Sequence, residues 1–239
     1  MKTIFVLLLS AISLNTFATW ETIKGNGNLK KETRNASGYT GIELQGSMDV
    51  QIDYGRSNSI TIEADENLLP YIEIEVENGN LKIRQKKGVN LKSKNKLIVH
   101  ASLTKLTNIV LSGSGNIIGD GDFSNYGTTT VKLSGSGNIG LGVADISELD
   151  VSISGSGNIS IKGSQSNNIS VAISGSGNLD CSNFVTNDVL ARVSGSGNIS
   201  VNAAKSIDAR VSGSGNIYYK GAATNLSMKA SGSGKIIKV

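Results

Sequence analysis

Residues able to carry out nucleophilic or acid–base chemistry are scarce in this chain of 239 residues. It has one histidine, His100, and one cysteine, Cys181, so a Ser-His-Asp or Cys-His arrangement would have to use them. A zinc site needs several His or Cys ligands, which the chain does not supply. His100 lies in an alternating stretch without a marked partner. We therefore expect both residues to be structural, with Cys181 acting as a small buried hydrophobic side chain.

Carboxylates and glycine motifs give no clearer catalytic pattern. Polysaccharide cleavage would use clustered acids, and the acids of the second half look scattered among loops and outward positions: Asp145, Glu148, Asp150, Asp180, Asp188 and Asp208. Residues 135–140 match a dinucleotide-binding fingerprint, but that motif requires a following helix. Calcium-binding repeats need Asp at regular intervals, where this chain has Asn or Ser. We expect no catalytic, cofactor-binding or metal-binding residue, and a protein that is not an enzyme.

Basic side chains are concentrated in one short segment, which is a candidate basic patch: Lys82, Arg84, Lys86, Lys87, Lys92, Lys94 and Lys96. As a functional surface it would suit an anionic glycan, lipopolysaccharide or nucleic acid. The lack of interleaved aromatic residues argues against nucleic acid. The alternative is a solvated outer face whose charges balance Glu73, Glu75 and Glu77, and we favour this alternative. The net charge of +4 indicates no partner by itself.

A second candidate surface comes from the motif Ser-Gly-Ser-Gly-Asn, which returns about every 20 residues, a period typical of stacked repeats. Its copies begin at Ser112, Ser134, Ser154, Ser174, Ser194 and Ser212. A further copy, Ser231–Lys235, ends in lysine. Stacking would align equivalent hydroxyls and amides into rows. The candidate surface ladder consists of Ser154, Ser156, Asn158, Ser174, Ser176, Asn178, Ser194, Ser196 and Asn198.

The segments on either side of the motif must form the strands that position it. Apolar residues stand before and after each copy at alternate places, as in Leu149, Val151, Ile153 and Ile159. Strict alternation with polar residues predicts strands with one buried face. Each period then contains a strand, a glycine corner, a second strand and a variable polar loop. A single coil cannot offset the conformational entropy of its residues, so the coils must stack.

The sequence therefore predicts an all-β protein, a parallel β-helix of about 20-residue coils with a less regular N-terminal β section. Gly accepts positive φ at a corner, and Asn can bond to its equivalents in neighbouring coils. The alternation of inward and outward positions is unbroken from Val151 to Ile161. This leaves a second possibility, in which the motif runs as a nearly straight strand with Gly facing inward. We favour the corner.

Three segments follow from these patterns. Residues 1–18 contain Lys2, an apolar run and Ala18, which predicts a secretory signal peptide. Residues 19–106 form an N-terminal β section continuous with the solenoid, and residues 107–239 carry the regular coils in a single elongated domain. This apolar run is too short to span a bilayer. No transmembrane segment is expected in the mature chain.

A hairpin is predicted inside the N-terminal section. Asn78-Gly79 is a typical two-residue turn between alternating segments. If Glu77 faces Asn80, the register places opposite charges across from each other and apolar residues across from apolar residues. The pairs are then Val76 with Leu81, Glu75 with Lys82, Ile74 with Ile83 and Glu73 with Arg84.

Four stretches together resemble the bacterial head GIN domain family, described as heads of auto-transporter adhesins. They are Tyr39–Leu44, Ile62–Leu69, Leu81–Arg84 and the repeated Gly-Ser-Gly-Asn, and the similarity extends over residues 38–236. The resemblance implies a right-handed parallel β-helix of the pectin-lyase type in an exported bacterial protein. It also implies cell adhesion, and it brings no catalytic residues to carry over.

The function expected is binding or adhesion to a glycan or cell-envelope surface through the repeated polar face. A polysaccharide lyase or hydrolase on the same scaffold is the alternative, and a purely structural envelope protein is a third. A groove with convergent acids and Lys or Arg would favour the enzyme. We expect a periplasmic, outer-membrane-associated or extracellular location and no nucleic-acid partner, and the oligomeric state stays open.

Overall fold

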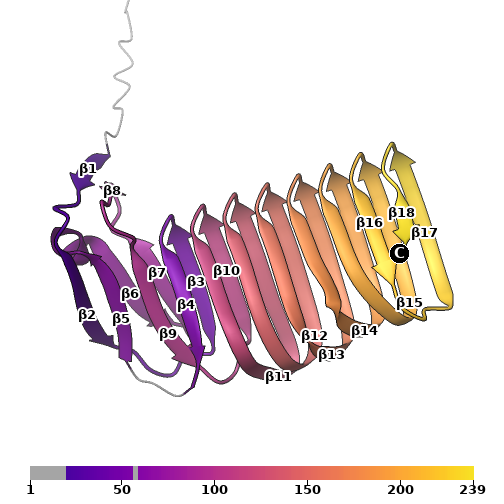
Figure 1. Cartoon of the computed structure of the whole chain (residues 1–239), viewed down its shortest axis with the longest axis horizontal. Coiled ribbons are helices and arrows are strands. Elements are labelled where there is room, and N and C mark those ends of the chain that lie inside the picture. Colours follow the sequence, from indigo (N-terminus) through magenta and orange to yellow (C-terminus); the bar gives the residue numbers. More distant parts are fainter. Residues whose placement is uncertain (1–19, 56–58) are drawn as a thin grey trace, which may run out of the picture.

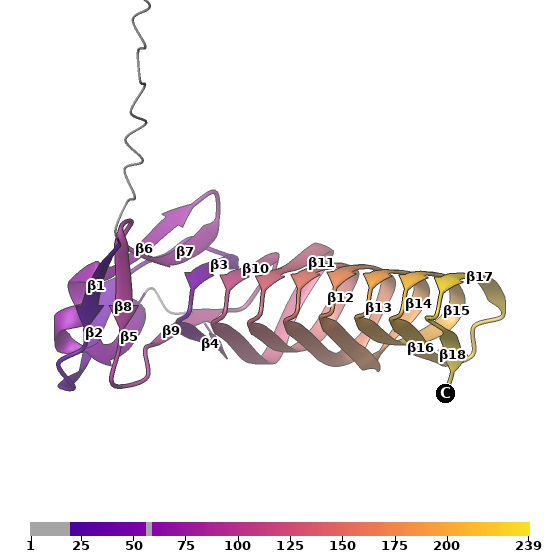
Figure 2. The ribbon, with the colours of Figure 1, turned by 90° about the horizontal axis from the view of Figure 1, so that it is seen from above.

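The computed structural model describes residues 20–55 and 59–239. These residues form an all-β solenoid in which flattened coils follow one another along a single axis (Figure 1). Short strands and a 3-10 helix lie over the N-terminal end of the stack (Figure 2). The predicted parallel β-solenoid with a less regular N-terminal section is confirmed. The predicted signal peptide, residues 1–18, lies outside the described residues.

The N-terminal section closes one end of the hydrophobic interior. Within it, β2 pairs antiparallel with β5, β5 pairs antiparallel with β9, and β1 pairs with β8 in a separate sheet. Leu68 and Leu69 of the 3-10 helix are buried. The elements are β1 (Glu21–Lys24), β2 (Leu29–Asn35), β5 (Ser59–Asp65), the 3-10 helix η1 (Glu66–Tyr71), β8 (Val89–Lys92) and β9 (Ile98–Leu103).

The first coil consists of β3 (Gly41–Gly46) and β4 (Asp49–Tyr54), and later coils stack on it in parallel. The register keeps the sequence repeats aligned, so that Asn138 lies beside Asn158 and Ile153 beside Ile173. The stacked strands are β10 (Asn108–Gly113), β11 (Asn116–Gly135), β12 (Asn138–Gly155), β13 (Asn158–Gly175), β14 (Asn178–Gly195), β15 (Asn198–Gly213), β16 (Asn216–Lys220), β17 (Asn225–Gly232) and β18 (Ile236–Lys238).

Each of the long strands β11 to β15 runs from one corner to the next and bends around the opposite edge (Figure 1). The polar loop expected at this edge is therefore a bend inside a continuous strand. Pairing with the neighbouring coil is interrupted at some positions of the bend and is regular again on both sides of it. Differences in coil length appear as register shifts, for example between Cys181 and Val185.

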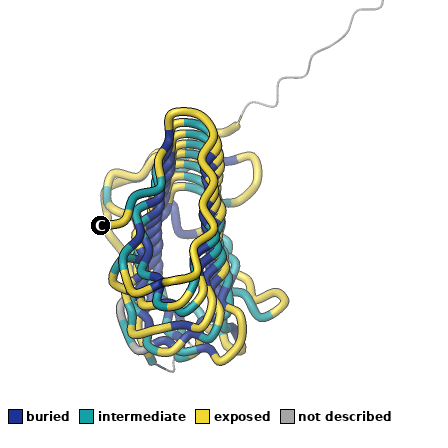
Figure 3. Tube along the Cα trace, turned by 90° about the vertical axis from the view of Figure 1, so that its right-hand side faces the viewer, coloured by how far each residue is buried: buried dark blue, intermediate teal, exposed yellow. Residues whose placement is uncertain are grey.

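The interior holds the apolar columns that the alternation predicted. Figure 3 shows the buried positions following one another from coil to coil. Val151, Ile153 and Ile159 are at most 2% exposed, and Phe123 and Phe184 are fully buried near the bends. Burying a side chain of this size contributes roughly 1.5–3 kcal/mol. Because neighbouring coils cover one another's apolar residues, this contribution grows with the number of coils.

The hairpin of β6 (Ile72–Glu77) and β7 (Asn80–Gln85) has the predicted register in every pair, from Ile74 with Ile83 to Glu77 with Asn80. Asn78 and Gly79 have positive φ of 51° and 75°, as a primed two-residue turn requires. Strand β7 also pairs in parallel with β3. The hairpin thus extends the sheet of the first coil and projects from the N-terminal section (Figure 2).

Candidate binding surface

The Ser-Gly-Ser-Gly-Asn copies form the corners of the coils and lie in a file along one edge of the solenoid. Strand β12 ends at Gly155 and β13 begins at Asn158, so Ser156 and Gly157 make the turn. The arrow tips along the upper edge of Figure 1 mark these corners. The predicted corner is confirmed, and the straight-strand alternative is wrong.

The two glycines of each copy are required for different physical reasons. Gly155 has φ of +119°, a backbone conformation that L side chains rarely adopt. Gly157 is buried, and a Cβ there would overlap the carbonyl oxygen of Gly137 and lie 2.6 Å from Leu133 Cδ2. This close approach lets two corner N–H groups donate to the carbonyl oxygen of Gly135 at 2.9 and 3.1 Å. The corners are therefore hydrogen-bonded from coil to coil.

The asparagines that end the copies are bonded to one another. From Asn138 to Asn216, each side-chain Nδ2 donates to Oδ1 of the asparagine in the preceding coil, at 2.9–3.2 Å. Before them, Asn116 donates to Asp49 Oδ1 at 2.7 Å. A carboxylate only accepts hydrogen bonds, so Asp49 suits the accepting end of this polarised row. At the other end the backbone N–H of Lys235 donates to Asn216 Oδ1 at 3.1 Å.

The serines of the candidate surface ladder differ from the asparagines in this respect. Ser154, Ser156 and their equivalents are exposed. In residues 20–55 and 59–239 their hydroxyls form no hydrogen bond with another protein group. The structure thus brings all nine ladder residues to one edge but gives them separate roles, because the asparagine amides join coils while the serine hydroxyls face solvent.

The ladder borders two grooves on the two faces of the flattened coil. Ser154, Ser174 and Ser194 precede the corner and line a groove of about 780 Å³, which we call the serine groove. Asn158, Asn178 and Asn198 follow the corner and line a groove of about 490 Å³, which we call the asparagine groove. Ser156, Ser176 and Ser196 stand at the corners between the two grooves.

A second row of side chains lines the serine groove two positions before each first serine. In the C-terminal coils this row becomes basic, with Arg192, Arg210 and Lys229 in register in adjacent strands. We call these three residues the cation column. The sequence analysis missed them because they are far apart in the chain. Their shared position relative to the repeat was the available signal.

The same face carries an acidic groove of about 390 Å³, lined by Glu148, Asp150, Asp188 and Asp208. The expectation that the acids are scattered is wrong for these four. They occupy outward-facing positions at alternate residues of their strands, so the stacking of the coils places them in one groove. Asp180 lines the asparagine groove instead, and Asp145 is exposed in the middle of β12. Within the described residues no three His, Cys, Asp or Glu side chains converge as ligands for a metal ion.

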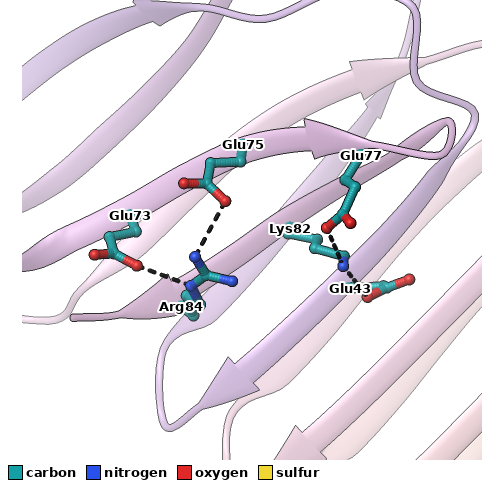
Figure 4. A network of polar contacts seen from close by, with 6 residues as sticks. All are labelled: Glu43, Glu73, Glu75, Glu77, Lys82 and Arg84. Atoms are coloured by element: carbon teal, nitrogen blue, oxygen red, sulfur yellow. Dashed lines mark hydrogen bonds and ion pairs between the residues drawn. The ribbon is translucent and has the colours of Figure 1, made fainter. Parts of the chain in front are cut away.

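The basic patch is divided among several settings. Arg84 Nε and Nη2 donate to Glu73 and Glu75 at 2.8 and 3.1 Å, and Lys82 lies between Glu77 and Glu43 (Figure 4). The hydrogen bond that Lys82 donates lowers the pKa of Glu77, and the hydrogen bond that Arg84 donates to Glu73 raises the pKa of Arg84. The charges of the hairpin therefore largely balance one another.

The other five basic residues lie outside the hairpin strands. Lys86 and Lys87 are exposed between β7 and β8, and Lys92 is aligned with Lys24 of β1. Lys94 and Lys96 line a cavity of about 320 Å³ that Asp49 also borders. The backbone N–H of Lys94 also donates to the buried Asp65 carboxylate, at 2.7 Å.

The isolated candidates for chemistry have structural surroundings. Cys181 is 1% exposed, and burial raises the pKa of its thiol. His100 lies in β9 with Gln51 and Thr61 as its neighbours in register. Residues 135–140, which match the dinucleotide fingerprint, continue into strand β12. None of the helices in the described residues has the length and apolarity needed to cross a bilayer.

Solved structures of bacterial proteins share this architecture. A "putative adhesin" from Bacteroides fragilis is 22% identical, with a TM-score of 0.81 over 91% of this chain and 100% of that chain. A "putative adhesin" from Parabacteroides merdae is 24% identical, with a TM-score of 0.70 over 92% and 99% of the two chains. A "Putative lipid binding protein" from Parabacteroides distasonis is 29% identical, with a TM-score of 0.64 over 92% and 100%.

The fold and its rows of corner residues define a β-solenoid whose architecture these solved structures share. Residues 38–223 match the family described as "Putative auto-transporter adhesin, head GIN domain". The chain belongs to this family, as the sequence resemblance indicated. None of the curated proteins matches it.

Proposed function

We propose that this protein is an exported, non-enzymatic solenoid that binds extended glycans of a cell envelope or cell surface through the polar rows beside its corners. The observation that carries the proposal is the serine groove, which crosses successive coils and is edged by Ser134, Ser154, Ser174, Ser194, Ser212 and Ser231. Family membership supports a role in adhesion. The predicted signal peptide supports export.

Binding would depend on repetition. Neighbouring strands lie about 4.8 Å apart, so an extended polymer lying along the axis would meet an equivalent hydroxyl at each coil. One such hydrogen bond is worth only about 0.5–1.5 kcal/mol. The rows are held in place by paired backbone and by the asparagine amides, so a ligand would need to order little of the protein. Several weak contacts then act together.

Retention of the purified protein on intact cells and on an array of envelope glycans tests this proposal. The informative variant is Ser154→Ala, Ser174→Ala and Ser194→Ala together. Its matched control is Ser164→Ala, Asn167→Ala and Asn183→Ala, three exposed residues away from the corners. We expect the first variant to lose retention and the control to keep it. Equal retention by both variants, or no retention of the folded wild-type protein, would refute the proposal.

Polysaccharide cleavage is the second candidate, because the acidic groove and the cation column share one face. A lyase or hydrolase needs a carboxylate or a basic group placed at a sugar ring. Incubation with pectin-like polymers, followed by assays for new reducing ends and for unsaturated uronates, separates the two functions. The binding proposal predicts neither product.

A further inference from the structure

We infer that the cation column makes the serine groove selective for a linear polysaccharide that carries carboxylate groups along its length. This inference deepens the proposed function and rests on it. It starts from the alignment of Arg192 with Arg210, and of Arg210 with Lys229, in adjacent parallel strands. Like charges placed directly opposite one another destabilise a sheet. Three cations spaced about 4.8 Å apart therefore favour a bound anion.

The protein supplies only part of that counter-charge. Asp208 accepts from Arg210 Nε and Nη2 at 3.2 Å each. Among the described residues, neither Arg192 nor Lys229 has an acidic partner. All three side chains are exposed. The hairpin cations offer a contrast, since Arg84 and Lys82 are each held by two glutamates.

The groove beside the column has the shape that a polysaccharide needs, and it offers serine hydroxyls in addition to the cations. Arg192, Arg210 and Lys229 form one side, and Ser194, Ser212 and Ser231 are found two positions further along the same strands. A guanidinium binds a carboxylate through two parallel N–H groups, while serine hydroxyls bond sugar hydroxyls. A ligand lying across the strands would place acid groups against one row and neutral hydroxyls against the other.

The acids of this face restrict where such a ligand can lie. Glu148, Asp150, Asp188 and Asp208 line the acidic groove, further from the corner than the cation column. They repel an anionic chain from that part of the face and leave the serine groove as its place. The charge is segregated into rows, so the fit depends on the direction of the ligand as well as on its sign.

Titration calorimetry with the full mature chain tests the inference. The probes are polygalacturonate oligomers of defined length, neutral malto-oligosaccharides of the same length, and inorganic polyphosphate. The variant is Arg192→Ser with Lys229→Ser, and the matched control is Lys162→Ser with Lys205→Ser, which removes the same charge from exposed positions elsewhere. Circular dichroism verifies that both variants are folded.

We expect the acidic oligomer to bind the wild-type protein more tightly than the neutral one does. The column variant should bind it roughly tenfold more weakly, since two exposed charge contacts are lost, and the control should match the wild type. Raising the salt from about 0.1 to 1 M, which shortens the Debye length from about 10 to 3 Å, should remove most of the difference.

The inference would be overturned by an equal loss in the control variant, by equal binding of the neutral oligomer, or by tighter binding of polyphosphate. Absence of binding by the acidic oligomer would also overturn it. Retention on cells and glycan arrays would still decide the proposed function on its own.

Discussion

Replacing Gly157 by alanine tests whether the close approach of stacked corners stabilises the solenoid. The new Cβ would overlap the carbonyl oxygen of Gly137 and lie 2.6 Å from Leu133 Cδ2. Overpacking of this kind costs about 1–3 kcal/mol. The displaced corner also weakens two N–H bonds to the Gly135 carbonyl, each worth about 0.5–1.5 kcal/mol. We expect a loss of about 3 kcal/mol in the free energy of unfolding.

Two matched variants separate the causes. Gly155→Ala adds the strain of φ +119° to a similar overlap with Gly135, a further cost of about 1–3 kcal/mol. Gly140→Ala meets open space, with no atom within 4 Å, and should be neutral or slightly stabilising. The assay is urea unfolding followed by far-ultraviolet circular dichroism, with midpoints compared because repeat arrays need not unfold in two states. A Gly157→Ala midpoint equal to that of Gly140→Ala would refute the reasoning.

Three further predictions concern other parts of the chain. Asn178→Ala removes the hydrogen bonds with Asn158 and Asn198, so it should lower the free energy of unfolding by about 1–2 kcal/mol. Chemical denaturation should show almost no loss for Ser176→Ala. A larger loss for Ser176→Ala than for Asn178→Ala would contradict the division between bonded asparagines and solvent-facing serines. Burial raises the pKa of the Asp65 carboxyl, but hydrogen bonds from Lys94 and Asn95 lower it by more. The net effect is a pKa below its usual range. The contribution of Asp65 to the free energy of unfolding is therefore present above the unfolded-state pKa of about 3.9 and is lost as pH falls through the lower folded-state value. In this pH window, stability plotted against pH should be flatter for Asp65→Asn than for the wild type. Parallel curves would exclude Asp65 as the cause of the acid sensitivity. Phe184→Ala empties a fully buried site and should cost about 3–5 kcal/mol in thermal unfolding, whereas Tyr126→Ala, at a residue 83% exposed, should leave the melting temperature nearly unchanged.

The coils could be predicted from the sequence because their physical requirements repeat. Val151, Ile153 and Ile159 show which face is buried, and the recurring glycines show where the chain turns. The hairpin register followed from charge pairing between Glu73 and Arg84, a short-range constraint that the structure reproduces. Because one face of each strand is buried, the positions of the side chains that point inward are fixed, and stacking leaves little freedom in the register of the strands.

The composition of the grooves could not be predicted in the same way, because it depends on which coils are neighbours along each column. Arg192, Arg210 and Lys229 come from three separate stretches, and only the register puts them side by side. The acids Glu148 and Asp188 were judged by their distance in sequence and so looked scattered. The division between bonded asparagines and solvent-facing serines likewise depends on side-chain geometry that periodicity does not contain.

Affinity measured against ligand length tests most directly the claim that binding comes from repeated contacts along the coils. The serine row from Ser134 to Ser231 spans five strand spacings, or roughly 24 Å at about 4.8 Å each. We predict that the affinity of a retained glycan rises steeply as oligomers lengthen to this span and then levels off. An affinity that is already maximal for the shortest fragment that binds would contradict the account.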